Sequence, residues 1–370
     1  MFVNIGISGP TQFISQMSSN LHVAAATVAI AAGAYYLLVH RHRQRKPDYF
    51  GKTRTDAKLY DVRTEAHPPT LYSATAVPCD YNVCAGSWDA AGHTQLKRYE
   101  QQSYLVVNEA LTVTDVHAAI EALGDLASSK EFREAANRTM EKQSSGTLRL
   151  SDGGDHPVLQ LESFAASIDE TERFKLANVR KLQGLLRWHP TVQRIANDTR
   201  LRTLVSQLLV ASGASPDDAA AADVFQSLAL LKPRGGREKP WHQDLAYFNM
   251  DHTSSHIVGC WIALSDVTAA NGAMHVLPTP IADLECLPHF TRRDWQICDT
   301  FADSRPCVAV PLSPGGALLF SGMLPHGTPT NLSGGQRLAL QFHFIARNAT
   351  KIDDAERQRR WGGDGRGVHC

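Results

Sequence analysis

The chain has 370 residues, and 37 lysines and arginines balance 37 aspartates and glutamates. This balance excludes a protein that holds nucleic acid or acidic partners through a strong overall charge. Apolar residues make up 43% of the chain, which is enough for a sizeable core in one large domain or two smaller ones. The 7 cysteines are scattered without a CxxC pair, which is typical of free thiols in a reducing compartment.

The N-terminal part is predicted to anchor the protein to a membrane. After an uncharged segment, residues 1–20, the run from Leu21 to Val39 is apolar and lacks Asp, Glu, Lys and Arg. About 20 such residues span a hydrocarbon core as a helix. The basic cluster Arg41–Lys46 follows the run, which is atypical of a cleavable signal peptide and predicts a single-pass protein whose remaining chain faces the cytoplasm. A buried helix or an organelle-targeting segment is the alternative.

The next region, residues 40–100, is expected to be a basic flank and an irregular extension, since it is rich in Pro, Gly, Thr, Asp and His. Ordered structure is then predicted to start with a strand at 104–107. One amphipathic helix should begin near Thr114 and Asp115, and a second should span 195–211.

From Val224 onwards, short apolar runs are separated by Gly, Pro and Asn. Runs at this spacing predict a double-stranded β-helix, a cupin-like jelly roll, rather than alternating βαβ units. Helices followed by strands predict an α+β domain at 101–348, with helices backing the jelly roll, and a polar tail at 349–370. The predicted strands are 224–231, 257–264, 273–277, 307–310, 317–320 and 337–345.

Two histidines and an aspartate near the ends of these strands form a candidate metal site. His242 and Asp244 lie two residues apart, so in an extended segment they point to the same face. An HxD pair among 16 histidines is expected about once by chance, so its context decides. That context is His326, which follows the run 317–320 and should reach the same end of the barrel.

Two histidines and a carboxylate on one side of a metal suit non-haem Fe(II), because adjacent positions stay open for a chelating co-substrate and O₂. Arg337, at the start of the last run, could hold the far carboxylate of that co-substrate through two hydrogen bonds. Zinc could bind the same three residues with water in the fourth position, but zinc gives Arg337 no role. The pattern therefore predicts an Fe(II)- and 2-oxoglutarate-dependent oxygenase.

From about Tyr104 to Ile345 the chain resembles the phytanoyl-CoA dioxygenase family of 2-oxoglutarate oxygenases. The resemblance rests on PWHQD at 240–244, GCWIALSDVTAANGAMHVLP at 259–278, PGGALLFSGMLPHGTPTNLS at 314–333, and Arg337. It implies that His242, Asp244 and His326 bind iron and that Arg337 binds the C5 carboxylate of 2-oxoglutarate. It also implies further co-substrate contacts, with Trp261 lining the pocket, Lys181 turned toward 2-oxoglutarate, Leu228 where relatives often carry a methionine, and Gln243 as a supporting group.

The expected cofactors are Fe(II), 2-oxoglutarate as co-substrate and O₂, with ascorbate as a further candidate. Related halogenases replace the carboxylate ligand with a small residue, so Asp244 favours hydroxylation or another ordinary oxidation. The predicted membrane anchor favours a small or lipid-like organic substrate. Three alternatives stay open: desaturation, epimerisation or cyclisation with the same cofactors; a zinc- or nickel-dependent cupin-like hydrolase or isomerase; and a non-catalytic scaffold. Ordinary surface or core positions are expected for His252, His256, His275 and His343, and solvated charge for Arg357–Arg360.

Overall fold

The computed structural model describes residues 77–78, 83–84, 91–149, 153–291, 294–298, 301–302 and 304–362. The predicted membrane segment at 21–39 and most of the extension before residue 91 lie outside these residues, so both stay predictions. The predicted start of ordered structure at residue 104 is wrong, because the helix α3 (His93–Gln102) precedes that strand. Within the described part of the chain, no helix is both long and apolar enough to cross a bilayer.

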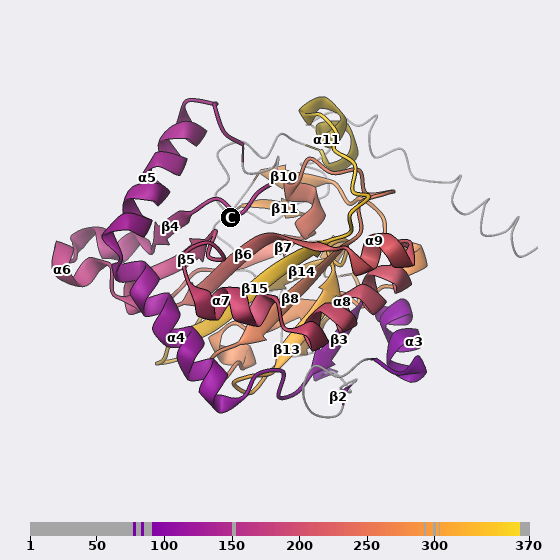
Figure 1. Ribbon diagram of the computed structural model, residues 1–370, viewed down its shortest axis with the longest axis horizontal. Coiled ribbons are helices and arrows are strands. Elements are labelled where there is room, and N and C mark those ends of the chain that lie inside the picture. The colour runs from indigo at the N-terminus through magenta and orange to yellow at the C-terminus, as the bar shows by residue number, and fades with distance from the viewer. Residues whose placement is uncertain are drawn as a thin grey trace, which may run out of the picture. The chain divides into compact units, whose positions relative to one another are not determined.

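Two sheets face each other in the jelly roll (Figure 1). The described part of the larger sheet has 8 strands in the order β2-β3-β13-β8-β15-β6-β5-β4, and the smaller has 5 in the order β1-β12-β9-β14-β7. The larger sheet contains β2 (Val83–Cys84), β3 (Tyr104–Val107), β13 (Ala317–Ser321), β8 (Ile257–Ala263), β15 (Arg337–Ile345), β6 (Asp223–Lys232), β5 (Val179–Gln183) and β4 (Val158–Leu161). The smaller contains β1 (Val77–Pro78), β12 (Val308–Val310), β9 (Met274–Val276), β14 (His326–Thr328) and β7 (Lys239–His242).

The predicted jelly roll is confirmed, and each of the six runs predicted from Val224 onwards is a strand whose ends differ by at most one residue from the prediction. The strands that the pattern missed are short. For example, β7 has the sequence KPWH and lies at the edge of its sheet, where a proline costs no ladder hydrogen bond.

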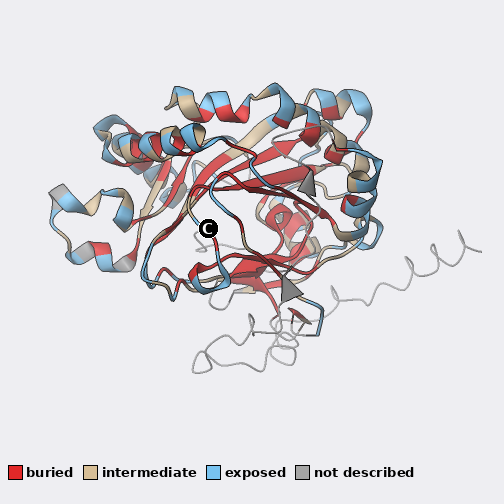
Figure 2. Ribbon diagram, turned by 90° about the horizontal axis from the view of Figure 1, so that it is seen from below, coloured by how far each residue is buried: buried red, intermediate tan, exposed pale blue. Residues whose placement is uncertain are grey.

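Helices cover the outer face of the larger sheet, and their buried sides turn toward the strands (Figure 2). The side chains of the last strand alternate between the two faces of the sheet: Leu340 and Phe342 pack in this outer core, whereas Ala339 packs between the sheets. The main helices are α3 (His93–Gln102), α4 (Val113–Ser128), α5 (Lys130–Ser144), α7 (Pro190–Ala196) and α8 (Thr199–Ala211), with the shorter α6 (Glu170–Arg173) and α9 (Pro216–Ala220) beside them.

The helix predicted at 195–211 is two helices rather than one. α7 ends at Ala196 and α8 begins at Thr199, because the Asp198 side chain accepts a hydrogen bond from the Arg200 backbone N–H and so caps a new helix. In α4 the capping residue is Thr112, whose side chain accepts a hydrogen bond from the Asp115 backbone N–H. The helix therefore begins at Val113, just before the predicted start near Thr114.

One end of the jelly roll is covered by the turn η4 (Asp244–Tyr247), the hairpin β10 (His289–Thr291) and β11 (Trp295–Ile297), and the C-terminal helix α11 (Asp354–Trp361). The solvated charge predicted for Arg357 is wrong. Its side chain is buried, donates to the Ala246 carbonyl at 3.2 Å and lies 5.1 Å from the centre of the Trp295 ring. α11 therefore packs onto the turn that begins with Asp244.

Candidate metal centre and co-substrate pocket

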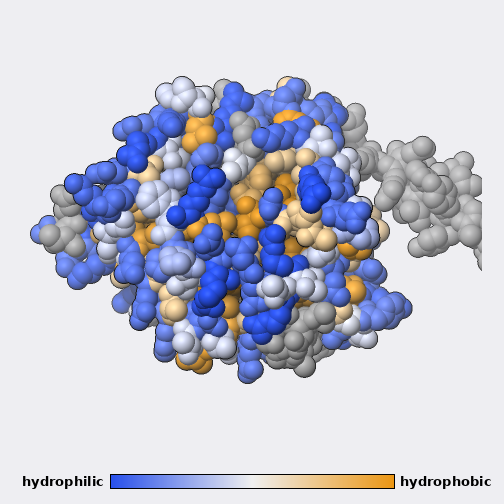
Figure 3. Space-filling view, in the orientation of Figure 1, coloured by the Kyte–Doolittle hydropathy of each residue, from blue (hydrophilic) through white to orange (hydrophobic). Residues whose placement is uncertain are grey.

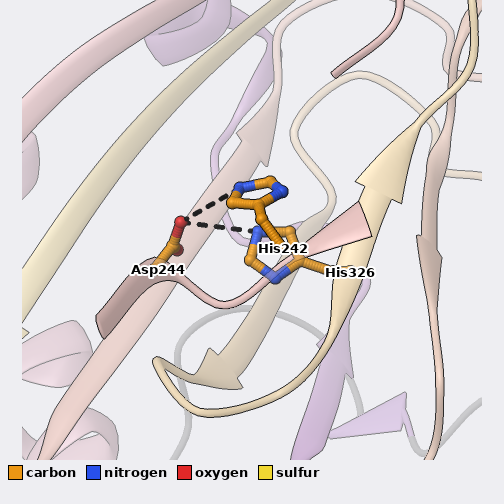
Figure 4. Close-up of side chains that lie close together, drawn as sticks. All are labelled: His242, Asp244 and His326. Carbon is orange, nitrogen blue, oxygen red and sulfur yellow. Dashed lines mark ion pairs between the residues drawn. The ribbon is translucent and has the colours of Figure 1, made fainter. Parts of the chain in front are cut away.

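His242, Asp244 and His326 come together at the covered end of the jelly roll (Figure 4). His242 ends β7 and His326 begins β14, and the two residues are direct partners across these strands. Asp244 Oδ1 lies 3.4 Å from His242 Nε2 and 3.5 Å from His326 Nε2. One ligand atom from each residue lies within 4.8 Å of the others, and all three residues are buried. This arrangement fits one metal ion with an open side.

Backbone carbonyls fix both imidazoles in the form that binds a metal. His242 Nδ1 lies 2.8 Å from the Pro240 carbonyl, and His326 Nδ1 lies 2.9 Å from the Leu324 carbonyl. Because a carbonyl can only accept, each Nδ1 carries the proton and leaves Nε2 with its lone pair. Burial and the neighbouring His326 lower the pKa of His242 to about 4, so this ring is neutral at neutral pH.

A third histidine orients the carboxylate ligand. His343 Nε2 donates to Asp244 Oδ2 at 2.8 Å, while Oδ1 faces the other two histidines. Burial alone would raise the pKa of Asp244, but His326 and His343 hold it well below its usual range. The prediction of an ordinary core position for His343 missed this contact. The signal was present, since His343 continues the alternation of Arg337, Ala339 and Gln341 on the inner face.

Arg337 is a buried cation with free hydrogen-bond donors. It is 3% exposed, its guanidinium lies 5.1 Å from the centre of the Trp261 ring, and burial lowers its pKa to about 9, so it stays charged at neutral pH. Among the described residues, no acceptor lies within hydrogen-bond range of Nε or Nη1. Burying a charge in this state is costly unless an anion completes the site. A carboxylate, which accepts two parallel hydrogen bonds from arginine, fits it.

The strand register places the other predicted pocket residues on the same inner face. Gln341 is the direct partner of both Leu228 and Trp261, and Leu230 is the partner of Lys181. Partners across neighbouring strands point to the same side of a sheet. Leu228, Trp261 and Lys181 are therefore buried on the face that carries Arg337, whereas their contacts with 2-oxoglutarate stay predictions.

Gln243 supports the loops around the metal ligands. Its Nε2 donates to the carbonyls of Glu285 at 2.8 Å and Met323 at 2.6 Å, and its Oε1 accepts from the Leu287 N–H at 2.9 Å. These three bonds use both amide protons and one lone pair of Oε1, so the Gln243 side chain fixes the loops.

A polar network missed by the sequence prediction ties the β10–β11 hairpin to the metal centre. Lys239 Nζ donates to Tyr247 Oη and to Asp294 Oδ2, both at 2.7 Å, and Tyr247 Oη donates to the Trp295 carbonyl at 2.6 Å. The Tyr247 ring stands edge-on to His242, with ring centres 5.6 Å apart. The hairpin is thus linked to His242 through Tyr247 of η4.

The jelly roll with its His-Asp-His cluster defines the class of iron- and 2-oxoglutarate-dependent oxygenases. The family model for phytanoyl-CoA dioxygenase (PhyH) matches residues 99–339, and the chain belongs to this family of 2-oxoglutarate-dependent dioxygenases.

Several known proteins are similar to this chain over most of their length. Phytanoyl-CoA dioxygenase domain-containing protein 1 of Danio rerio is 19% identical over 274 residues, which cover 70% of this chain and 91% of the relative. Its Rattus norvegicus counterpart is 23% identical over 272 residues, covering 68% and 89%. Among solved structures, EctD from S. alaskensis with 2-oxoglutarate and 5-hydroxyectoine is 19% identical, with a TM-score of 0.45 and coverage of 73% and 83%.

Proposed function

We propose that the protein is an Fe(II)- and 2-oxoglutarate-dependent dioxygenase that hydroxylates a C–H bond of a small or lipid-like organic substrate. Succinate and CO₂ are the products of the co-substrate. The observation that carries the proposal is the buried Arg337, whose free donors lie on the same inner face as the His343 that orients Asp244. This combination supports a metal site and a carboxylate site that share the interior of the jelly roll.

When bound, iron with 2-oxoglutarate and O₂ supplies an oxidant strong enough for an unactivated C–H bond. His242, Asp244 and His326 would hold the metal on one side, with each imidazole oriented by the backbone carbonyl at its Nδ1. Arg337 would bind the C5 carboxylate and orient the co-substrate, with Trp261 beneath its guanidinium. The hairpin and α11 would exclude water from this end of the jelly roll.

The predicted substrate is a small or lipid-like organic molecule. Figure 3 shows a mostly hydrophilic face with apolar side chains gathered near its middle. The predicted membrane segment at 21–39 favours a lipid-like molecule reached from the cytoplasmic side. Desaturation, epimerisation or cyclisation would use the same ligands, and Asp244 as the carboxylate ligand argues only against halogenation.

A zinc- or nickel-dependent hydrolase is the competing proposal, and one experiment separates the two. The full-length protein is mixed anaerobically with Fe(II) and 2-oxoglutarate, the visible charge-transfer band is recorded, and succinate is measured after air is admitted. Wild type should give both signals, whereas His326→Ala and Arg337→Ala should lose them. His117→Ala and Arg359→Ala, at exposed positions outside the site, are matched controls. A wild type without band and succinate, or site variants that keep both, would rule the dioxygenase out.

A further inference from the structure

Gln183, the last residue of β5, has a buried side-chain amide that no residue in the described part of the chain satisfies. It is 0% exposed, and neither its Oε1 nor its Nε2 has a hydrogen-bond partner among those residues. Leaving a buried amide unpaired costs free energy, whereas a leucine or methionine of similar size carries no such cost. The unpaired amide therefore points to a ligand group that completes its hydrogen bonds.

The strand register places Gln183 on the inner face of the larger sheet, near the metal end. Gln183 is the direct partner of Leu228 on β6, and Leu228 is the partner of Gln341 on β15. Gln341 Nε2 lies 2.8 Å from Nε2 of His343, the histidine that orients the carboxylate ligand. β15 carries both His343 and Arg337, so the co-substrate is expected along β15. Gln183 lies two strands, or about 10 Å, to its side, where a second ligand can bind.

Backbone contacts hold this end of β5 in place. Asp155, in the loop before β4, accepts hydrogen bonds from the backbone N–H of Ser227 at 2.6 Å and from its hydroxyl at 2.7 Å. The Gly184 N–H donates to the Ser227 carbonyl at 2.9 Å. Gly184 has a φ of +75°, and a Cβ there would lie 2.3 Å from the His156 backbone, so the turn requires glycine. Gln183 is therefore presented by a fixed turn, which suits a residue that selects a ligand.

An apolar surface lies on the metal side of Gln183. The half-buried Phe225 on β6 packs edge-to-face on Phe248 with ring centres 4.7 Å apart, and the Phe248 ring centre lies 5.7 Å from that of His343. Phe225 is three residues from Leu228, the partner of Gln183, so the aromatic pair and the amide lie about 10 Å apart along the strand. A substrate that reaches from one to the other has an apolar body and one polar end.

We infer that Gln183 is a specificity-determining residue of the substrate site, and that its amide binds a neutral substrate group that both donates and accepts a hydrogen bond, such as a carboxamide or a hydroxyl. Such a group pairs with Oε1 and Nε2 together. A carboxylate or an ammonium group would match one of these atoms and oppose the other. The inference rests on the proposed dioxygenase function, and it assigns a chemical class to the end of the substrate that lies away from the metal.

The test titrates two probes of the same shape into the full-length protein, which is loaded with Fe(II) and 2-oxoglutarate under anaerobic conditions. Hexanamide and heptan-2-one share an alkyl chain and a carbonyl, and differ only in an NH₂ group against a methyl group. The change in the charge-transfer band and ligand-observed NMR each give the two dissociation constants. Wild type should bind hexanamide about 5- to 50-fold more tightly, the scale of leaving buried polar groups unpaired. Gln183→Leu should bind the two probes within about twofold of each other and should bind 2-oxoglutarate as wild type does.

Gln183→Met, which keeps the length of the side chain without its amide, should give the same result and tests the inference if the leucine variant does not fold. Gln193→Leu, at an exposed position in α7, is the matched control and should keep the preference for hexanamide.

Three results would overturn the role of Gln183 alone, because the band in wild type would still support the dioxygenase. These are equal affinities of wild type for the two probes, no binding of either probe, and a preference for hexanamide that survives in Gln183→Leu. A loss of 2-oxoglutarate affinity in Gln183→Leu would make Gln183 a co-substrate contact and would overturn the inference as well. A wild type without any band would overturn the dioxygenase function and the inference with it.

Discussion

Replacement of His343 by leucine tests how the fold prepares Asp244 for a metal. In the wild type, His343 Nε2 donates to Asp244 Oδ2 at 2.8 Å in a buried environment. Leucine removes this donor, so the carboxylate can rotate away from the position in which Oδ1 faces His242 and His326. Groups that orient a metal ligand typically change metal affinity by about 10- to 100-fold. This range corresponds to about 1.4–2.7 kcal/mol of binding free energy.

The assay is an anaerobic Fe(II) titration with 2-oxoglutarate in excess, with the midpoint read from the charge-transfer band. The matched control is His275→Leu, because His275 is also buried but lies in β9 and bonds through Nδ1 to the Ala273 carbonyl. His343→Gln, which keeps an N–H donor, should fall between wild type and His343→Leu. If His343→Leu folds with a native circular dichroism spectrum and binds Fe(II) within about twofold of wild type, the reasoning is refuted.

Three further predictions concern stability. Gln183 is fully buried and its amide has no hydrogen-bond partner among the described residues, so Gln183→Leu should leave the thermal midpoint unchanged or raise it. Gln243→Leu loses three hydrogen bonds and should lower the free energy of unfolding by about 2 kcal/mol or more. Equal thermal midpoints for the two variants would contradict this prediction. Burial lowers the pKa of His242 to about 4 and that of His289 to about 3, whereas the ordinary value for an unfolded histidine is 6.5. At a pH between the folded and unfolded values, the unfolded chain therefore binds more protons than the folded protein. The free energy of unfolding of the metal-free protein should therefore fall as the pH falls through this window, and a flat profile in thermal melts would count against the buried neutral rings. Arg357→Ala should lower the thermal midpoint more than Arg359→Ala, because only Arg357 is buried against Ala246 and Trp295, and equal shifts would show that α11 does not hold this end of the jelly roll.

Most of the jelly roll and all three candidate metal ligands could be predicted from the sequence. Where apolar residues alternate along a strand, as at 337–345, the sequence indicates which residues face inward. His242 and His326 each lie at the end of a strand, and these two strand ends are neighbours in the smaller sheet. The alternation also placed Arg337 on the inner face, where the structure has it buried over Trp261.

The residues that the sequence missed depend on contacts between distant segments. His343 was treated as an ordinary histidine because nothing local shows that Asp244 lies within reach, 99 residues away in sequence. Lys232 follows an apolar strand and looks like the charged start of a turn, yet it crosses between the sheets to Thr328. Arg357 belongs to a polar stretch, and its side chain is buried because α11 packs on the turn η4. Such roles follow from tertiary packing, which overrides local charge.

The position of His343 and α11 bears on where the functional unit of this chain ends. The family match stops at residue 339, whereas the partner of Asp244 is at 343 and the helix that packs on the Asp244 turn runs to Trp361. A protein cut at the family boundary would keep every metal ligand and Arg337 but would lose the residue that orients one ligand and part of the wall beside it. Expression trials, truncation alleles and domain swaps should therefore preserve the chain through at least Gly362, because the C-terminal stretch completes the site that the family motif begins.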